Sequence, residues 1–174
     1  MAERRDAVLR EACDHLSNSL KFTLQLKPEQ CNAVDSLHKK DDVLAVLPTG
    51  YGKSLIFQLF AVAVSIEGEE RQTVLVICPL KSITEDQIAE AGSIGISAAS
   101  TEDISEDELR AAKFQLIFGS AVTVMEKRFL DIMKDNCSSL DRKLAAVVVD
   151  ESHTVEMWTG KRYYVSNKSY WGYF

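Results

Sequence analysis

The sequence predicts an α/β fold, a mostly parallel β-sheet with helices on both faces. Short apolar, β-branched runs alternate along the chain with helix-compatible runs, and this alternation is typical of parallel sheets. A glycine-containing segment at residues 47–54 joins one apolar strand to an apolar helix, and another apolar strand, at residues 145–149, ends in two carboxylates. With 174 residues, 46% of them hydrophobic, the chain is long enough for one domain with a core.

The first two elements are predicted to be helices. Residues 3–20 carry apolar side chains at helical spacing, which indicates an amphipathic helix. A second helix is expected from Pro28 to about residue 38, because proline suits the first turn of a helix. Strands are then predicted at residues 43–47, 73–78, 94–98, 115–118 and 145–149. Helices are predicted among them at residues 53–66, 82–91, 106–113 and about 122–134. Ser105 and Glu108 have the spacing of a capping box, which predicts the helix start at residue 106.

The charge balance argues against a protein that binds nucleic acid through a globally positive surface. The chain has 20 basic and 26 acidic residues and a net charge of −6, although a local basic face stays open as an alternative. The four cysteines are scattered without metal-ligand spacing, so we expect reduced thiols. The amino terminus is charged, and no apolar run approaches the roughly 18–20 residues of a membrane span. We therefore expect a soluble intracellular protein.

The first glycine-containing segment has the layout of a phosphate-binding loop: strand, turn, Lys-Ser, helix. Gly50 and Gly52 allow positive φ angles and close backbone approach, so that N–H groups can converge on phosphate oxygens. The helix that begins near Lys53 adds its unpaired N–H groups. Lys53 is expected to contact the β- and γ-phosphates, and the Ser54 hydroxyl is expected to bind Mg²⁺. Such loops carry glycine where this chain has Leu47, and the alternative is a glycine-rich turn without a ligand.

The second chemical signal is the carboxylate pair that follows the strand at residues 145–149. Asp150 is expected to hold Mg²⁺ through water, and Glu151 to polarise the water that attacks the γ-phosphate. Both are predicted at the carboxyl edge of a parallel sheet, where ligands bind in open α/β folds. A strand-end acidic turn is the simpler alternative for this pair. His153 has a similar alternative, as a polar residue at a helix N-terminus.

Four segments resemble those of the first RecA-like lobe of a superfamily 2 helicase, most specifically of the RecQ family. The sequence LKPEQ at residues 26–30 resembles the segment whose glutamine reads the adenine edge. PTGYGKS at residues 48–54 resembles helicase motif I, and PLKSITEDQ at residues 79–87 resembles the RecQ form of motif Ia. DESH at residues 150–153 resembles the DEAH box, with serine where alanine is usual. Trp158 then stands where the aromatic-rich loop of RecQ helicases begins.

The resemblance implies an ATP-dependent DNA helicase that uses ATP and Mg²⁺ and moves 3′ to 5′ on DNA. The implied fold is a RecA-like P-loop NTPase lobe. The implied catalytic residues are Lys53, Asp150, Glu151 and His153, and the implied metal ligands are Ser54 and Asp150. Contacts with the nucleotide are implied for Lys27, Gln30, Thr49, Gly50, Tyr51, Gly52, Lys53 and Ser54. Contacts with nucleic acid are implied for Pro79, Leu80, Gln87 and Trp158.

Several of these residues also have a structural alternative. Gln30 can be solvated on a helix surface, although an amide that donates and accepts matches adenine N6 and N7. Pro79, Leu80 and Gln87 can be ordinary strand-end and helix residues. Trp158 can fill the edge of a core instead of coupling DNA to the ATP site, where base stacking would give a sequence-tolerant contact.

The carboxyl-terminal part of the chain departs from the RecQ pattern. The family continues through an aromatic- and arginine-containing loop to a Ser/Thr-Ala-Thr strand, and then to a second RecA-like lobe with an arginine finger. None of these motifs follows Trp158 here. In the family that strand lies between the phosphate-loop strand and the Asp-Glu strand, so we expect a sheet that is incomplete at its centre. The expected organisation is an N-terminal helix (1–20), an ATP-binding domain (21–162) and an atypical aromatic tail (163–174), in which Gly172 interrupts any strand pattern.

Two functions are compatible with these observations. The first is the ATP-binding lobe of a RecQ-like helicase that acts on DNA in the nucleus. The second is a truncated fragment that binds nucleotide or DNA without turnover, because a missing arginine finger costs ~10³–10⁵ in rate in P-loop systems. An unrelated P-loop kinase or GTPase is a weaker interpretation. A GTPase needs Asn-Lys-x-Asp to recognise guanine, and residues 167–170 read NKSY.

Overall fold

A six-stranded β-sheet organises the chain, whose computed structural model describes residues 2–68, 70–150 and 171–173. The strands lie in the order β1–β6–β5–β2–β4–β3, and every neighbouring pair is parallel. This confirms the predicted parallel sheet. The bounds of the strands are β1 (Val43–Leu44), β2 (Thr73–Ile77), β3 (Ala98–Ser100), β4 (Leu116–Gly119), β5 (Leu144–Val149) and β6 (Trp171–Tyr173).

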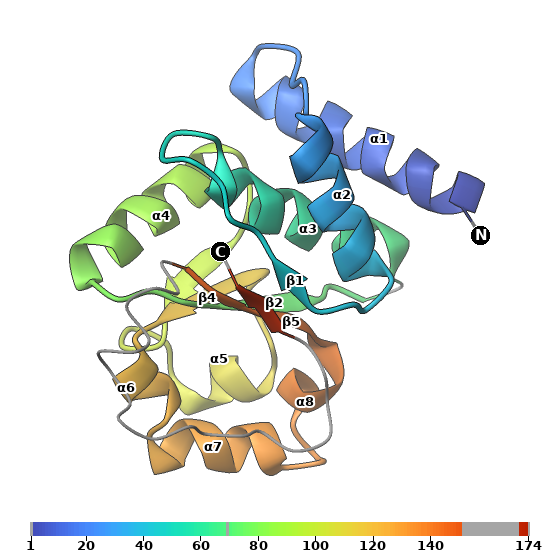
Figure 1. Ribbon diagram of the computed structural model, residues 1–174. Coiled ribbons are helices and arrows are strands. Elements are labelled where there is room, and N and C mark those ends of the chain that lie inside the picture. The colour runs from blue at the N-terminus through green and yellow to red at the C-terminus, as the bar shows by residue number, and fades with distance from the viewer. Residues whose placement is uncertain (1, 69, 151–170, 174) are drawn as a thin grey trace.

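Helices cover both faces of the sheet, as predicted (Figure 1). One face carries α1 (Ala2–Leu20), α2 (Pro28–His38), α3 (Lys53–Glu67) and α4 (Lys81–Ser93). The other carries α5 (Glu106–Arg110), α6 (Ala121–Val124), α7 (Lys127–Lys134) and α8 (Ser139–Lys143). No helix in the described ranges is long and apolar enough to cross a membrane.

The two faces have separate hydrophobic cores because strand side chains alternate. Along β2, Val74 and Val76 pack against the core of α1 to α4, whereas Leu75 packs against the core of α5 to α8. Helix α3 is the centre of the first core, and the ring of its Phe57 meets Phe118 of β4 edge to face at 6.2 Å between centroids. Burial of this helix along most of its length positions its N-terminus at the sheet.

Several predicted boundaries were wrong. The strand expected at residues 43–47 extends only over Val43–Leu44, and the helix expected at residues 106–113 ends at Arg110. The strand expected at residues 94–98 lies at Ala98–Ser100, because Ile94 is the C-cap of α4 and the backbone N–H of Ile96 bonds to the Ala91 carbonyl at 2.9 Å. Gly95, with φ of 80°, then turns the chain away from the helix. These buried isoleucines produced an apolar run that suggested a strand, although they close a helix instead.

The helix expected at about residues 122–134 divides into α6 and α7. Glu126 has an extended backbone, with φ of −63° and ψ of 145°, and acts as the N-cap residue of α7. Helix α8 was not predicted; its five residues follow Ser138, whose hydroxyl accepts from the Leu140 N–H. By contrast, the capping box of α5 is confirmed, because Ser105 and Glu108 each accept a hydrogen bond from the other's backbone N–H.

The expectation of an empty position at the centre of the sheet was also wrong. Residues Trp171–Tyr173 form strand β6, which pairs with β5 on one side and with β1 on the other. Gly172 therefore lies within a strand, opposite Val148 and Val43. Ladder hydrogen bonds are made by the backbone, so a segment without a strand-like side-chain pattern can still occupy a vacant position between two strands.

Candidate functional site

The predicted site residues gather at the carboxyl edge of the sheet. In a parallel sheet all strands end at one edge, and here β1, β2 and β5 lead to the phosphate loop (residues 48–52), Cys78 and Asp150. The backbone N–H of Asp150 donates to the Ile77 carbonyl at 3.0 Å, which ties the end of β5 to the end of β2. Glu151, His153 and Trp158, which sequence analysis also assigned to a site, lie outside the described residues.

The phosphate loop has the backbone conformation that its glycines predicted. Gly50 and Gly52 have φ angles of 75° and 85°, which side-chain-bearing residues rarely adopt. The Tyr51 N–H donates to the Pro48 carbonyl at 3.1 Å and closes a turn. A Cβ at Gly50 would meet nothing within 4 Å, whereas a Cβ at Gly52 would lie 2.7 Å from Nε2 of Gln30. The loop is therefore open at Gly50 and closely packed at Gly52.

The loop leads directly into the N-terminus of α3. Gly52 is the N-cap residue in the left-handed conformation, and no side chain caps the helix there. Lys53 and Ser54 are its first two residues, so both lie next to backbone N–H groups that lack an intrahelical partner. Leu47, which stands where the common pattern has glycine, packs against the main core and does not have a positive φ angle, so this position needs no glycine.

The first turn of α2 holds the phosphate loop by several contacts. Gln30 Nε2 donates to the carbonyls of Tyr51 and Gly52, both at 3.1 Å, and Gln30 Oε1 accepts from the Lys27 N–H at 2.9 Å. Lys27 Nζ donates to the Tyr51 carbonyl at 3.2 Å and lies 3.6 Å from the centre of the Tyr51 ring. The Tyr51 hydroxyl donates to Glu29 Oε2 at 2.7 Å, a contact that sequence analysis missed.

These contacts bring together three residues that were assigned to the nucleotide: Lys27, Gln30 and Tyr51. Gln30 is only 3% exposed, and both N–H donors of its amide are bonded within the chain. In this conformation Gln30 supports the loop rather than offering a free amide edge. The surface alternative for Gln30 is therefore wrong, since the side chain is buried against the loop.

Asp150 lies in a largely buried environment next to Cys78. Asp150 is 8% exposed. Burial of the Cys78 thiol is the main cause that raises its pKa to about 12, and the negative charge of the Asp150 carboxylate adds to this shift. Thr84 of α4 hydrogen-bonds to this thiol and opposes the shift in its pKa. The thiol is therefore protonated at neutral pH and behaves as a small apolar group beside the carboxylate.

Ser54 and Gln87 are in direct contact across the interface between α3 and α4. Gln87 Nε2 donates to Ser54 Oγ at 3.2 Å. Its Oε1 atom is buried and has no hydrogen-bond partner among the described residues. Sequence analysis assigned Gln87 to a nucleic-acid surface, but the structure brings it to the expected metal ligand instead.

The other described residues assigned to nucleic acid lie after the end of β2. Leu80 is the N-cap residue of α4 and is 59% exposed, and Pro79 precedes it with partial exposure. Val122 of α6, after the neighbouring strand β4, is 74% exposed. A hollow of about 220 Å³ opens near the same end of β4; its lining includes Thr101, Glu102, Thr123, Glu126 and Arg128. Exposed apolar side chains thus follow the ends of two adjacent strands, β2 and β4.

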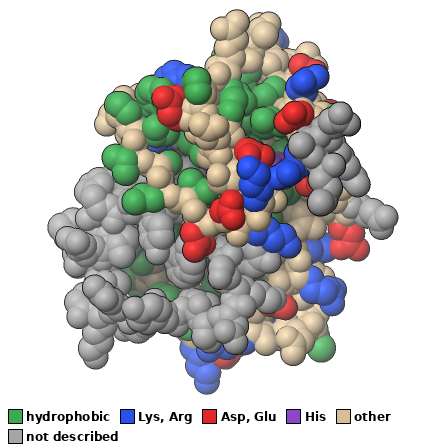
Figure 2. All heavy atoms as spheres, turned by 45° about the vertical axis from the view of Figure 1, so that its right-hand side comes forward, with side chains coloured by type: hydrophobic (Ala, Val, Ile, Leu, Met, Phe, Trp, Pro, Cys, Tyr) green, Lys and Arg blue, Asp and Glu red, His purple; other side chains and the backbone are tan. Residues whose placement is uncertain are grey.

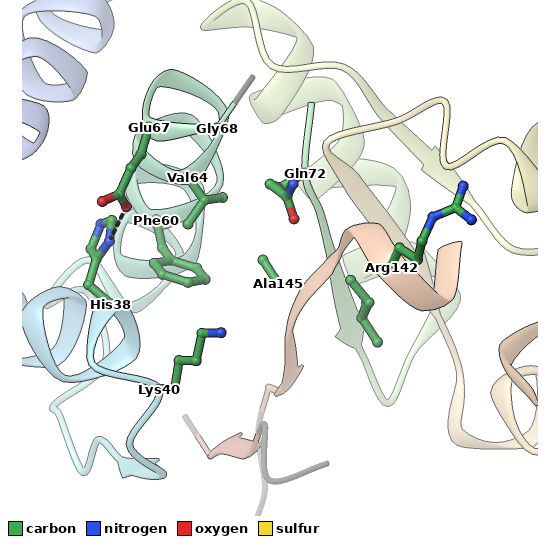
Figure 3. Close-up of a pocket in the computed structure, with 10 residues that line it drawn as sticks. His38, Lys40, Phe60, Val64, Glu67, Gly68, Gln72, Arg142 and Ala145 are labelled. Carbon is green, nitrogen blue, oxygen red and sulfur yellow. Dashed lines mark ion pairs between the residues drawn. The ribbon is translucent and has the colours of Figure 1, made fainter. Parts of the chain in front are cut away.

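A second hollow, of about 260 Å³, lies at the opposite, amino edge of the sheet (Figure 3). Its lining includes Gln72 before β2, Ala145 at the start of β5 and Glu67 at the end of α3. His38 Nδ1 pairs with Glu67 Oε2 at 3.4 Å on its wall. It is therefore separate from the phosphate loop, at the other end of α3.

On the face that Figure 2 shows, Lys and Arg side chains lie beside Asp and Glu side chains, in keeping with the mixed charge of the sequence.

Comparison with known proteins supports the resemblance seen in the sequence. The family model described as "DEAD/DEAH box helicase" matches residues 27–168. The chain is 34% identical over 139 residues to the ATP-dependent helicase SGS1 of Saccharomyces cerevisiae, covering 76% of this chain and 10% of that protein. It is 30% identical over 148 residues to the ATP-dependent DNA helicase Q1 of Rattus norvegicus, covering 79% of this chain and 23% of that protein. The chain thus spans about a tenth to a quarter of the length of these relatives.

Solved structures of helicases share the fold. The DUF1998 helicase MrfA bound to DNA superposes with a TM-score of 0.59 at 22% identity, over 80% of this chain and 21% of that one. A hypothetical ATP-dependent RNA helicase from Sulfolobus tokodaii gives a TM-score of 0.56 at 17% identity, over 100% of this chain and 50% of that one. The predicted RecA-like α/β lobe is confirmed.

Proposed function

Because this chain belongs to the DEAD/DEAH box helicase family, we propose that it is the ATP-binding lobe of a RecQ-like, 3′-to-5′ ATP-dependent DNA helicase. The observation that carries this proposal is the uncapped N-terminus of α3, preceded by two glycines with positive φ and placed at the same sheet edge as Asp150. Helix N-termini of this kind bind phosphate through their free N–H groups and their dipole. The nucleus is the proposed place of action, in line with the RecQ resemblance.

The residues at this edge fit a nucleotide with Mg²⁺. The loop is open at Gly50, where even an added Cβ would meet nothing, so an anion can approach the backbone. Mg²⁺ binds through one or two protein oxygens, phosphate oxygens and several waters, and a hydroxyl at Ser54 with a carboxylate at Asp150 suits that preference. Bound ATP with Mg²⁺ would supply the phosphoanhydride bond whose hydrolysis drives a helicase.

The roles of the chain's own residues follow from their chemistry. Lys53 places a positive charge at the start of α3, next to the phosphates. The Ser54 hydroxyl and, through water, the Asp150 carboxylate would hold the metal ion. Thr49 and Tyr51 contribute backbone groups to the loop. Glu151 and His153 are proposed from the sequence alone, Glu151 to orient the attacking water and His153 to complete the DEAH-type motif.

DNA is the proposed polymer substrate, and its contacts are proposed beyond the carboxyl ends of β2 and β4. Pro79 and Leu80 immediately precede α4 at this edge, and Trp158 is proposed to stack on a base. The guanidinium of Arg128, which is exposed and also donates to the Ile104 carbonyl, is a donor of the kind that positions a sugar–phosphate backbone. Unwinding is proposed for this lobe only in combination with a second RecA-like lobe.

The test is a titration of this chain with the fluorescent nucleotide mant-ADP in the presence of Mg²⁺. Replacement of Lys53 by Ala removes the charge at the loop and is expected to weaken binding by roughly 10–100-fold, with an unchanged circular dichroism spectrum. The matched control is Lys39→Ala, which removes a lysine at the far end of α2 that pairs with Asp35. Equal affinity in the Lys53 variant and the native chain would rule out the nucleotide site.

A further inference from the structure

We propose that Gln87 is a positioning residue for the metal-binding hydroxyl of Ser54, and that its unpartnered Oε1 accepts a hydrogen bond from the hydration shell of bound Mg²⁺. This inference rests on the proposed nucleotide site and extends it to α4. It also reassigns a residue whose sequence context suggested contact with nucleic acid.

The first observation is the direction of the bond between Gln87 and Ser54. Gln87 Nε2 donates to Ser54 Oγ at 3.2 Å, so one lone pair of the hydroxyl oxygen is used by the amide. The second lone pair is left for a cation, and the rotation of the hydroxyl about its C–O bond is restricted. An amide that donates to a metal-binding hydroxyl orients it in the way that outer partners orient other metal ligands.

The second observation is the acceptor that Gln87 leaves unsatisfied. Among described side-chain atoms that are buried without a hydrogen-bond partner, three are found: His38 Nε2, Gln58 Nε2 and Gln87 Oε1. His38 lies at the amino edge of the sheet, and Gln58 Nε2 is a donor, so Gln87 Oε1 is the one acceptor next to Ser54. A buried acceptor that is left without a donor destabilises the structure, which calls for an explanation.

The chemistry of hydrated Mg²⁺ matches this acceptor. Mg²⁺ keeps several of its waters when it binds proteins, and a water bound through its oxygen presents only hydrogens outward. An amide oxygen can accept such a hydrogen, whereas an amide NH₂ cannot. Gln87 would therefore serve two partners, the Ser54 hydroxyl with its Nε2 and a water of the ion with its Oε1.

The placement of Gln87 on α4 connects two surfaces. Leu80, at the start of the helix, is exposed, while Gln87, seven positions later, reaches α3. The same helix thus presents its beginning to solvent and holds a metal ligand near its middle.

The experiment measures how Mg²⁺ changes the affinity of the whole chain for mant-ADP. Dissociation constants are determined in EDTA and across a Mg²⁺ titration, for the native chain and for Gln87→Ala and Gln87→Met. Both variants remove the amide donor and acceptor. Gln87→Met retains the side-chain volume, so it is expected to fold and can be measured even if the alanine variant is unstable. The Mg²⁺ midpoint is the Mg²⁺ concentration at which half of its effect on mant-ADP affinity is reached. Both variants are expected to raise this midpoint by roughly 10–100-fold and to leave the mant-ADP affinity in EDTA unchanged.

The chain offers a matched control at the other end of α3, the helix that carries Ser54. Gln115 Nε2 donates to Ser65 Oγ of α3 at 3.2 Å, the same kind of bond far from the loop. Gln115→Met is expected to leave the Mg²⁺ midpoint at the native value. In a Ser54→Ala background, Gln87→Met is expected to add less than it does alone, because the part of its effect that passes through Ser54 is already lost.

The outcomes separate this inference from the function on which it rests. A native chain that does not bind mant-ADP overturns the nucleotide site and this inference with it. If the native chain binds mant-ADP with Mg²⁺ and the Gln87 variants have the native Mg²⁺ midpoint, the role of Gln87 is overturned and the nucleotide site is not. Full additivity with Ser54→Ala overturns the claim that Gln87 acts through that hydroxyl.

Discussion

Gln30 ties the phosphate loop to the first turn of α2 with both ends of its amide. Its Nε2 donates to two loop carbonyls and its Oε1 accepts from the Lys27 N–H, so the side chain is fully used while buried. The adenine-reading role proposed from the sequence requires the same donor and acceptor. The two roles differ in one measurable respect: loop support affects all nucleotides, whereas adenine recognition affects ATP more than GTP.

Replacement of Gln30 by Ala is therefore expected to have two effects. Loss of support for the Tyr51 and Gly52 carbonyls weakens binding of both nucleotides, and loss of adenine recognition narrows the ATP-over-GTP preference by ~1–3 kcal/mol. Competition titrations with ATP and GTP against mant-ADP measure both effects. An equal loss for the two nucleotides would assign Gln30 to the loop alone.

Glu151 is expected to matter for hydrolysis and little for binding. It follows Asp150 at the end of β5, where a carboxylate can orient the attacking water. When a second RecA-like lobe is joined to this chain, Glu151→Gln should retain ATP affinity and lose turnover. Steady-state ATPase assays and mant-ADP titrations give the comparison, and turnover within a few-fold of the native rate would assign the water to another residue.

At the scale of elements, the ends of α2 and α3 meet around a buried histidine. His38, at the end of α2, has a side chain that is 5% exposed, pairs with Glu67 and meets the Phe60 ring edge to face at 5.2 Å. Burial lowers the pKa of His38, while the Glu67 and Asp35 carboxylates oppose that shift and Arg5 adds to it. The neutral imidazole is therefore the form that the packed helices favour.

This environment predicts a stability that decreases in mild acid. Because the folded-state pKa of His38 is below its ordinary value of about 6.5, protons bind more readily to the unfolded chain. The stabilisation is present above about pH 6.5 and is lost as the pH decreases toward the folded-state pKa. Thermal melts between about pH 7.5 and about pH 5.5 should show a decreasing midpoint, and His38→Phe should reduce that slope.

A second histidine on the same side of the molecule provides the control. His15 lies exposed on α1, so His15→Gln is expected to leave the pH dependence of the melting temperature unchanged. A native slope that persists in His38→Phe would assign the acid sensitivity to other groups.

At the scale of the whole molecule, strand β6 joins the two halves of the candidate site. Among the described strands, β1 pairs only with β6, and β6 pairs in turn with β5. Within the ladder of the described strands, the strand that leads to the phosphate loop is therefore connected to the strand that leads to Asp150 through residues 171–173. The contacts of α2 and α3 with the loop add to this connection, and the sheet part of it depends on a three-residue strand.

Disruption of β6 is accordingly expected to lower both stability and nucleotide affinity. Gly172→Pro removes a backbone donor from the middle of this strand, and deletion of residues 171–174 removes the strand itself. Either change should lower the melting temperature by about 5 °C or more, since roughly 1 kcal/mol corresponds to about 2–4 °C in a chain of this size. Hydrogen exchange of residues 43–47 should become faster.

The same measurements test whether the tail contributes to the sheet in solution. An unchanged melting temperature and unchanged protection of residues 43–47 in both variants would show that β1 is held by other contacts. Asp103→Pro, in the loop before α5, is not an equivalent control. The backbone N–H of Asp103 donates to the Ser100 carbonyl, so proline would remove that hydrogen bond as well. Asp41→Ala, in the exposed turn before β1, changes a side chain without altering a ladder and provides the comparison.

Short-range features of this protein were determined by its sequence. The phosphate loop needed positive φ angles at Gly50 and Gly52, the capping box of Ser105 and Glu108 started α5, and the alternation of apolar runs predicted a parallel sheet. Each depends on residues within a few positions of one another, or on a periodicity that one element carries by itself. Membership of the helicase family was likewise readable from motifs.

Long-range partners were decided only by the tertiary structure. Nothing in the sequence around Gln87 indicates that it meets Ser54, 33 positions away, or that the Gln30 amide is occupied by loop carbonyls. The pattern at residues 171–173 gave no sign of a strand, yet β6 occupies the position between β1 and β5. The physical reason is that backbone ladders and buried amide bonds depend on which surfaces come together, and side-chain periodicity carries no information about an unpaired edge.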